Sequence, residues 1–354
     1  MNKGKFQSWF NRYALIISML IGAIGHSWFR QLDFLLPTLI FLMLFFTFCK
    51  IDPVDLRLRK WHGIVLFTQI TLSLGVYYGA VCLLNWLSLF IAISPADMAM
   101  ITQGAMICII MPTASAAPII AGKLGGSIEN LTTFTLLSNI ATAILVPTIF
   151  PIINPAAGID FLPAMWAILR KVAPLLIAPF LLAWLVRIVY NRYYRFKGTS
   201  RTFTLPTKWS SIPFYLWTIM LIILMGKITH NLIIQEYSGW SILVVCIGAL
   251  VGCIIQFALG WFIGYHAPAK SHGKDYQDIY INPDAANYTI QQKSRITAGQ
   301  AFGQKNTALG VWMAQAYLTP LADIAPAAYI IWQNLLNSIQ LWLAGRAKKP
   351  QSKG

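Results

Sequence analysis

Two hydrophobic segments of this chain are each interrupted near the middle by polar and helix-breaking residues. The interruptions read MPTASAAP at residues 111–118 and GQAFGQKNTALG at residues 299–310. Lipid offers no partner for a freed backbone N–H or C=O group, so a break at membrane depth survives only inside protein or beside a watery cavity. Paired breaks are typical of the substrate site of a transporter. We therefore expect substrate-binding roles for Thr113, Ser115, Asn306 and Thr307.

Composition predicts the membrane environment that these breaks require. Hydrophobic residues make up 57% of the 354 residues and charged residues 11%, whereas a soluble domain has about 25% charged residues. The mean hydropathy is +0.62. A span needs about 20 mostly apolar residues. The pattern predicts ten spans, at Tyr13–Phe29, Phe34–Lys50, His62–Leu84, Pro95–Lys123, Asn130–Ile152, Lys171–Tyr190, Pro213–Thr229, Trp240–Tyr265, Arg295–Leu318 and Pro326–Gly345.

The ten predicted spans divide into two halves of an all-α membrane protein. Residues 1–152 hold the first five spans and residues 153–354 the second five, with a polar cytoplasmic loop at residues 267–293. An odd number of spans per half inserts the second half upside down relative to the first. The interrupted span is the fourth of each half, which is the symmetry of an inverted repeat.

Basic residues predict the orientation, because Lys and Arg accumulate in loops that stay cytoplasmic. Most of the 27 Lys and Arg residues fall in loops on one side, and this places both termini in the cytoplasm. The exceptions are Arg30, Arg170, Lys171, Lys227 and Lys305. Basic loops facing an anionic leaflet also explain the net charge of +16. We expect a bacterial inner-membrane protein whose partners are the bilayer and a small substrate, without nucleic acid or an obligate protein partner.

Catalytic and cofactor chemistry finds little support in the sequence. The five cysteines lie in or beside apolar stretches without paired spacing, and the five histidines are scattered. We therefore expect no disulfide framework and no structural metal site. A Gly-rich phosphate loop is absent from the sequence, so ATP hydrolysis is not expected. The prediction is a non-enzymatic protein without a cofactor.

Several short motifs resemble the bile acid:sodium symporter family. They are SPAD at residues 94–97, MPTAS at 111–115, VPTIFP at 146–151 and GQKNTAL at 303–309, where the family has a Gly-Met-Gln-Asn-Ser-Gly-Leu pattern. The resemblance extends over most of Phe34–Trp342. It implies ten spans in a panel domain and a core domain, with broken spans four and nine crossing in the core.

The family holds two sodium ions at that crossing, and this sequence departs from the pattern there. For the first site the resemblance assigns Ser115, Thr135 and Asn139, but Ala116 and Ala301 replace two oxygen donors. At the second site it assigns Gln69, whereas the partner glutamine becomes Lys305. Sodium prefers oxygen ligands, as calcium and magnesium do, and an ammonium would repel it. The sites are therefore predicted to be remnants of sodium sites.

All eleven carboxylates lie in predicted loops or near span ends, so Lys305 is the predicted charge at membrane depth. An ammonium at a helix centre costs about 2.5–3.5 kcal/mol on insertion scales. Our hypothesis is that it replaces the second sodium ion, held by oxygens of Gln69, Ser115 and backbone carbonyls, and that it can load and release a proton. Two alternatives are that Lys305 snorkels to water, or that Gln304 occupies the ligand position.

The sequence thus predicts a secondary transporter that moves a small organic anion by alternating access. Half-helix N-termini carry partial positive charge, which favours an anionic substrate. Lys305 would add to that charge. The alternatives are a sodium-coupled symporter, an uncoupled facilitator and a non-transporting membrane receptor.

Overall fold

The computed structural model describes residues 16–50, 56–155, 159–197, 203, 205–206, 209, 212–234, 238–268 and 288–347, and their side chains as far as residue 344. The predicted start of the first span at Tyr13 and most of the predicted cytoplasmic loop at 267–293 lie outside these residues.

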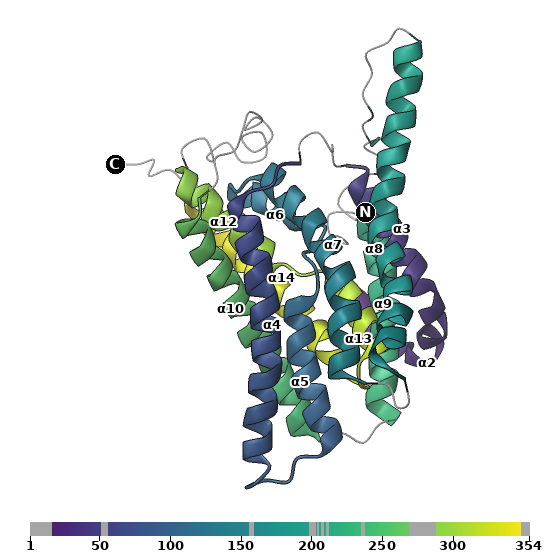
Figure 1. The fold of residues 1–354 in the computed structure, drawn as a ribbon, viewed down its shortest axis with the longest axis vertical. Coiled ribbons are helices and arrows are strands. Elements are labelled where there is room, and N and C mark those ends of the chain that lie inside the picture. The colour runs from purple at the N-terminus through teal and green to yellow at the C-terminus, as the bar shows by residue number, and fades with distance from the viewer. Residues whose placement is uncertain are drawn as a thin grey trace, which may run out of the picture.

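The described chain is a bundle of helices (Figure 1). Residues 16–24 are also helical. The helices that follow are α2 (His26–Phe29), the 3-10 helix η1 (Arg30–Leu35), α3 (Leu36–Phe48), α4 (Lys60–Leu87), α5 (Pro95–Ile110), α6 (Ala117–Leu124), α7 (Ile128–Ile153), α8 (Phe161–Phe196), α9 (Ile212–Ile234), α10 (Gly239–His266), α12 (Ile290–Gly303), α13 (Thr307–Tyr317) and α14 (Ile324–Ala347).

Lipid is the solvent that these helices require. Within the described residues, six helical segments are long and apolar enough to cross a membrane, namely His26–Phe48, Lys60–Leu87, Ile128–Ile153, Phe161–Phe196, Ile212–Ile234 and Gly239–His266. Helix α10 shows why: Leu243, Ile247 and Val251 are exposed on one face, and Val245 and Ala249 are buried on another. A helix that is apolar on all sides is stable in a membrane or in a protein core. The chain is an α-helical integral membrane protein.

One predicted boundary is wrong. Helix α8 begins at Phe161, directly after Asp160, and runs to Phe196, whereas the predicted span was Lys171–Tyr190. Arg170 and Lys171 are exposed and lie inside the helix, in its first third. Arg and Lys are good helix formers, so charge on a solvent-facing or headgroup-facing surface does not end a helix.

Two segments are interrupted where the sequence predicts breaks. Helix α5 ends at Ile110, and Met111 is extended (φ −58°, ψ 146°) because the residue before a proline is driven out of the helical region. Helix α6 then starts at Ala117 and ends at Gly125, whose φ of 93° favours glycine. In the second segment, Gln304 is extended and the side chain of Asn306 caps α13 by accepting from the Leu309 N–H.

Glycines bring α10 and α12 into backbone contact. A Cβ at Gly260 or Gly264 of α10 would lie within 3.0 Å of the α12 backbone, and a Cβ at Gly299 or Gly303 of α12 would collide with the rings of Trp261 and Phe257. Each pair of glycines has the four-residue spacing of a small-xxx-small packing motif. This contact fixes the first half of the second interrupted segment against α10.

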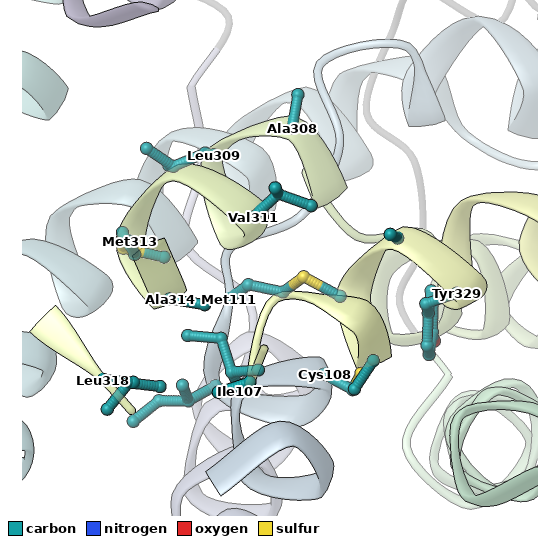
Figure 2. Packing of buried hydrophobic residues seen from close by; sticks show 14 of the residues in the cluster. Ile107, Cys108, Met111, Ala308, Leu309, Val311, Met313, Ala314, Leu318 and Tyr329 are labelled. Carbon is teal, nitrogen blue, oxygen red and sulfur yellow. The ribbon is translucent and has the colours of Figure 1, made fainter. Parts of the chain in front are cut away.

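A hydrophobic cluster lies beside the two breaks (Figure 2). Figure 2 shows Ile107 and Cys108 of α5, and Met111 just after it, close to side chains of α13, with Tyr329 of α14 at the side. Gly310 of α13 leaves room for the Met111 sulfur. Close packing of this kind resists local displacement, so the breaks sit on a rigid base.

Candidate functional site

The two breaks pair with each other as a short antiparallel segment. The Asn306 N–H donates to the Pro112 carbonyl (2.7 Å), and the Ala114 N–H donates to the Gln304 carbonyl (2.9 Å). Thr113 and Lys305 lie opposite one another as an isolated β-bridge. The breaks therefore satisfy part of each other's freed backbone, and the predicted crossing of the two interrupted segments is observed.

Lys305 places its ammonium at the C-terminal end of α5. Its Nζ donates to the Ile109 carbonyl (2.8 Å) and lies 4.9 Å from the centre of the Phe302 ring. The residue is 1% exposed, and within the described residues no carboxylate forms an ion pair with it. A helix C-terminus carries about half a negative charge, so the freed carbonyls of α5 act as the counter-charge of the ammonium.

Other donors from neighbouring helices serve the carbonyls around Ile109. Gln69 Nε2 of α4 donates to the carbonyls of Ile110 (2.9 Å) and Met111 (3.2 Å), and Gln256 Nε2 of α10 donates to that of Cys108 (3.3 Å). Four carbonyls at the end of an α-helix lack an intrahelical partner. Side-chain amides and one ammonium thus donate to the carbonyls at this interruption.

The hypothesis about the ligands of Lys305 is correct for the backbone carbonyl and wrong for two side chains. Gln69 turns its NH₂ group to α5 and leaves Oε1 without a partner, and Ser115 Oγ also has no partner. Two carbonyl acceptors dictate that amide orientation. Neither oxygen holds the ammonium; Gln69 and Lys305 instead serve adjacent carbonyls of the same helix end.

The structure contradicts the snorkelling alternative for Lys305 and turns the Gln304 amide NH₂ group to other partners. A snorkelling lysine would expose its ammonium, whereas this side chain is buried. The Gln304 amide donates to Gln300 Oε1 and to Asn337 Oδ1 (3.2 Å), away from α5. Extended backbone at residue 304 sends successive side chains to opposite sides, so residues 304 and 305 cannot share one role.

Gln333 of α14 was not predicted as a site residue and holds the main chain of Lys305. Its Oε1 accepts from the Lys305 N–H (2.9 Å), and its Nε2 donates to the Lys305 carbonyl (3.3 Å). The side-chain amide thus pairs with residue 305 as a strand would. A sequence signal existed: Gln333, Asn337 and Gln340 have the spacing of one face on an otherwise apolar helix.

Thr113 is engaged by the fold itself. Its Oγ1 donates to the Ala301 carbonyl (2.7 Å), and its N–H donates to Ser138 Oγ (3.1 Å). Thr113 and Ala301 are both fully buried. The predicted substrate-binding hydroxyl therefore links the two interrupted segments and has no free donor. Ser138 was not predicted as a site residue, and its hydroxyl anchors the break to α7.

Four predicted site residues keep a buried polar atom without a partner. They are Gln69 with Oε1, Ser115 with Oγ, Asn139 with Oδ1 and Asn306 with Nδ2. Thr135 and Asn139 lie one turn apart on α7, where Thr135 Oγ1 donates to the Leu131 carbonyl and Asn139 Nδ2 donates to the Thr135 carbonyl. Buried polar groups are normally paired, so these atoms are available to a ligand. Thr307 begins α13 and is buried beside them.

Ser115 and Asn306 offer donors at opposite ends of the paired segment. Ser115 lies two residues before the start of α6, and Asn306 directly precedes α13. Antiparallel pairing of Pro112 with Asn306 separates these two helix starts. A hydroxyl and an amide NH₂ beside the positive end of a helix can bind an acceptor group such as a carboxylate. The Lys305 ammonium is turned to the C-terminal end of α5, so its contribution to these anion sites stays a prediction.

Among the described residues there is no group of three or more His, Cys, Asp or Glu residues that could hold a metal ion. All five cysteines are free. No family model matches the chain, and no curated protein matches it either. The fold and the site define an integral membrane protein with two paired helix breaks around a buried lysine, and the resemblance to bile acid:sodium symporters stays a prediction.

Proposed function

We propose that the chain is a secondary transporter that moves a small organic anion across a membrane by alternating access. The observation that carries this proposal is the pairing of two interrupted helices, with Lys305 buried at the C-terminal end of α5. Interrupted helices at membrane depth are the usual binding elements of secondary transporters, where helix N-termini face anionic groups and C-terminal ends face coupling cations.

The proposed architecture is the ten-span inverted repeat predicted from the sequence. The six long apolar segments, the helix at residues 16–24, the two interrupted segments and α14 would together make ten spans. The first five would form residues 1–152 and the second five residues 153–354, with both termini in the cytoplasm of a bacterial cell. Under this arrangement each half contributes one interrupted segment to the pair.

Lys305 is the proposed substitute for a coupling ion. A sodium-coupled carrier needs a cation near the freed carbonyls of a broken helix, and here the Lys305 side chain occupies such a position. A covalently attached cation cannot dissociate with the substrate. The carrier would therefore run without sodium, driven by protons or by the substrate gradient. Sodium-coupled symport is the main competing reading, and a non-transporting receptor is the other.

Substrate binding would use the unpartnered groups at the two helix starts. Ser115 Oγ and Asn306 Nδ2 are donors beside the positive ends of α6 and α13, so either can bind one anionic group. Their placement at opposite ends of the pair gives each half of the molecule one such position. Thr307, in the first turn of α13, would support the Asn306 position, and the oxygens of Thr135 and Asn139 would line the remnant of the first sodium site.

The first test measures cation binding without knowledge of the substrate. Thermal unfolding of the purified protein would be followed in NaCl and in KCl at equal ionic strength, for wild type, Lys305→Gln and the control Lys171→Gln, which changes an exposed lysine. A ligand at a hundredfold excess over its dissociation constant stabilises the folded state by about 2.7 kcal/mol. We expect a sodium-specific rise in melting temperature for Lys305→Gln alone.

Transport is then measured in proteoliposomes with labelled benzoate, succinate and taurocholate as probes. We expect uptake of at least one anion by wild type, equal in sodium and in potassium, and its loss or its conversion to sodium dependence in Lys305→Gln. Sodium stabilisation of wild type would show an ordinary sodium symporter. Failure of all three anions, with no sodium response in any variant, would contradict the proposed role of Lys305.

A further inference from the structure

A buried carboxylate lies far from the paired breaks, in the connection between α13 and α14. Asp323 is 1% exposed and directly precedes Ile324, the first residue of α14. Its neighbours Leu321, Ala322 and Ala325 are buried and apolar. Carboxylates are almost never fully buried unless a partner holds their charge, so the partners of Asp323 are informative.

Asp323 has one neutral side-chain partner. Gln315 Nε2 of α13 donates to Asp323 Oδ2 (2.7 Å), while Asp323 Oδ1 and Gln315 Oε1 have no partner. A protonated carboxyl can donate its O–H to the free amide oxygen after the amide turns over, so the pair can be satisfied in either charge state. A single carboxylate offers too few oxygens for a hard metal cation, which takes six or more. The proton is the ligand that fits.

Lys227 of α9 is the cation whose charge acts on Asp323. It already forms an ion pair with another carboxylate. Lys227 Nζ lies 2.8 Å from Asp33 Oδ2 of η1 in a half-buried ion pair. Burial raises the pKa of Asp323 to about 6, against the smaller lowering effects of Gln315, the backbone N–H groups of Asp323 and Ile324, and Lys227.

The remaining elements packed around Asp323 bring few other charges. Tyr317 of α13 has a hydroxyl without a partner, and α5 contributes Asp97, whose Oδ2 accepts from Ser94. Helix α5 also lies against the connection through Gly104, next to the Ala322 carbonyl. Lys227 is therefore the cation that acts on both Asp323 and Asp33.

We propose that Asp323 is a proton-binding site, and that its charge state decides whether Lys227 stays with Asp33 or is shared with the α13–α14 connection. Protonated Asp323 leaves Lys227 to tie α9 to η1. Deprotonated Asp323 attracts the same ammonium toward the second interrupted segment, because α9 and α13 are in contact. The proton site needs no transport activity; its use as a coupling device rests on the proposed function.

The test uses the purified full-length protein and dicyclohexylcarbodiimide, an apolar reagent that adds to protonated carboxyl groups. Modified Asp323 is quantified by peptide mass spectrometry between pH 5 and pH 8, with Asp323→Asn as the blank. The protonated fraction falls about tenfold for each pH unit above the pKa, so we expect labelling with a midpoint near 6. Labelling that is absent or independent of pH in wild type overturns the proposal.

Two further variants test the competition for Lys227. Lys227→Met removes the positive charge and should move the labelling midpoint to higher pH, whereas Asp33→Asn frees Lys227 and should move it to lower pH. Shifts in the same direction, or no shift in either variant, would contradict the shared lysine. Uptake of the probe anions is recorded separately, so absence of uptake by wild type with these shifts intact would count against the carrier and keep the proton site.

Thermal stability gives an independent reading of the same site. The folded pKa is raised from 3.8 to about 6, so the folded protein binds the proton more tightly than the unfolded chain does. Stability is then greatest below the lower value and falls as the pH rises through this window. We expect wild type to lose melting temperature between about pH 4 and pH 6 relative to Asp323→Asn. Parallel profiles would contradict the proposal.

Discussion

At the scale of single residues, the carbonyls at an interrupted helix end need hydrogen-bond donors from elsewhere in the protein. Gln69 of α4, Gln256 of α10 and Lys305 of the break between α12 and α13 donate to the carbonyls of residues 108–111. An unsatisfied buried carbonyl or N–H costs about 1–3 kcal/mol, so these contacts stabilise the break as well as offering a site. Gln333 does the same for the backbone of Lys305.

Replacement of Gln333 tests how much its hydrogen bonds to the Lys305 main chain stabilise the protein. In Gln333→Leu the Lys305 N–H loses its acceptor, whereas the Lys305 carbonyl keeps the Thr307 N–H as a donor (2.9 Å). We expect a loss of about 1–3 kcal/mol in unfolding free energy, measured by denaturant titration in mixed micelles. The matched control is Asn334→Leu, since Asn334 donates only to the Ile330 carbonyl of its own helix. Equal losses of unfolding free energy in both variants would contradict a special role for the hydrogen bonds between Gln333 and the Lys305 main chain.

At the scale of elements, glycine spacing decides which helices come close. Gly260 and Gly264 let the α12 backbone approach α10, whereas a Cβ at Gly248 or Gly252 of the same helix would meet nothing within 4 Å. Close backbone approach is the main attraction available between helices in lipid, where the hydrophobic effect does not draw them together. The position of α12, and hence of residues 304–306, therefore depends on small residues.

Two alanine substitutions in α10 should have different effects on the stability of the protein. Gly260→Ala would force α12 away and should destabilise the protein by about 1–3 kcal/mol, as overpacking does. Gly252→Ala meets open space and should be neutral or stabilise it by about 0.5–1 kcal/mol, because alanine loses less backbone freedom. Both are read from thermal unfolding in the same detergent. A neutral Gly260→Ala would show that the contact is not tight.

At the scale of the whole molecule, basic residues predict which side of the bundle faces the cytoplasm. In Figure 1, the end of α8 and the α4–α5 connection lie at opposite ends of the long axis. Arg192, Arg195 and Lys197 are exposed at the end of α8. Residues 88–94 between α4 and α5 carry no Lys or Arg.

Cysteine accessibility in intact cells tests this orientation. Phe90→Cys lies in the α4–α5 connection and Lys197→Cys at the end of α8, and both parent residues are exposed. Cys82 and Cys246 are replaced by alanine beforehand, since the other native cysteines are buried. A membrane-impermeant maleimide should label position 90 in intact cells and position 197 only after permeabilisation. The reverse pattern would invert the predicted orientation.

The amino-acid sequence by itself determined the membrane class, the two interruptions and the presence of Lys305 within one of them. These are local properties: hydrophobic length, proline and glycine placement, and a charge inside an apolar segment act wherever the chain lies. The start of α8 at Phe161 was not predicted from the sequence, because surface charge does not end a helix.

Only the tertiary structure decided which groups meet. It turned Gln69 to the end of α5, left Ser115 Oγ without a partner, and placed Gln333 on the main chain of Lys305. It also buried Asp323, which the sequence placed in a loop. Hydrogen-bond partners and burial depend on the register and rotation of one helix against another, which arise from contacts between residues far apart in the chain.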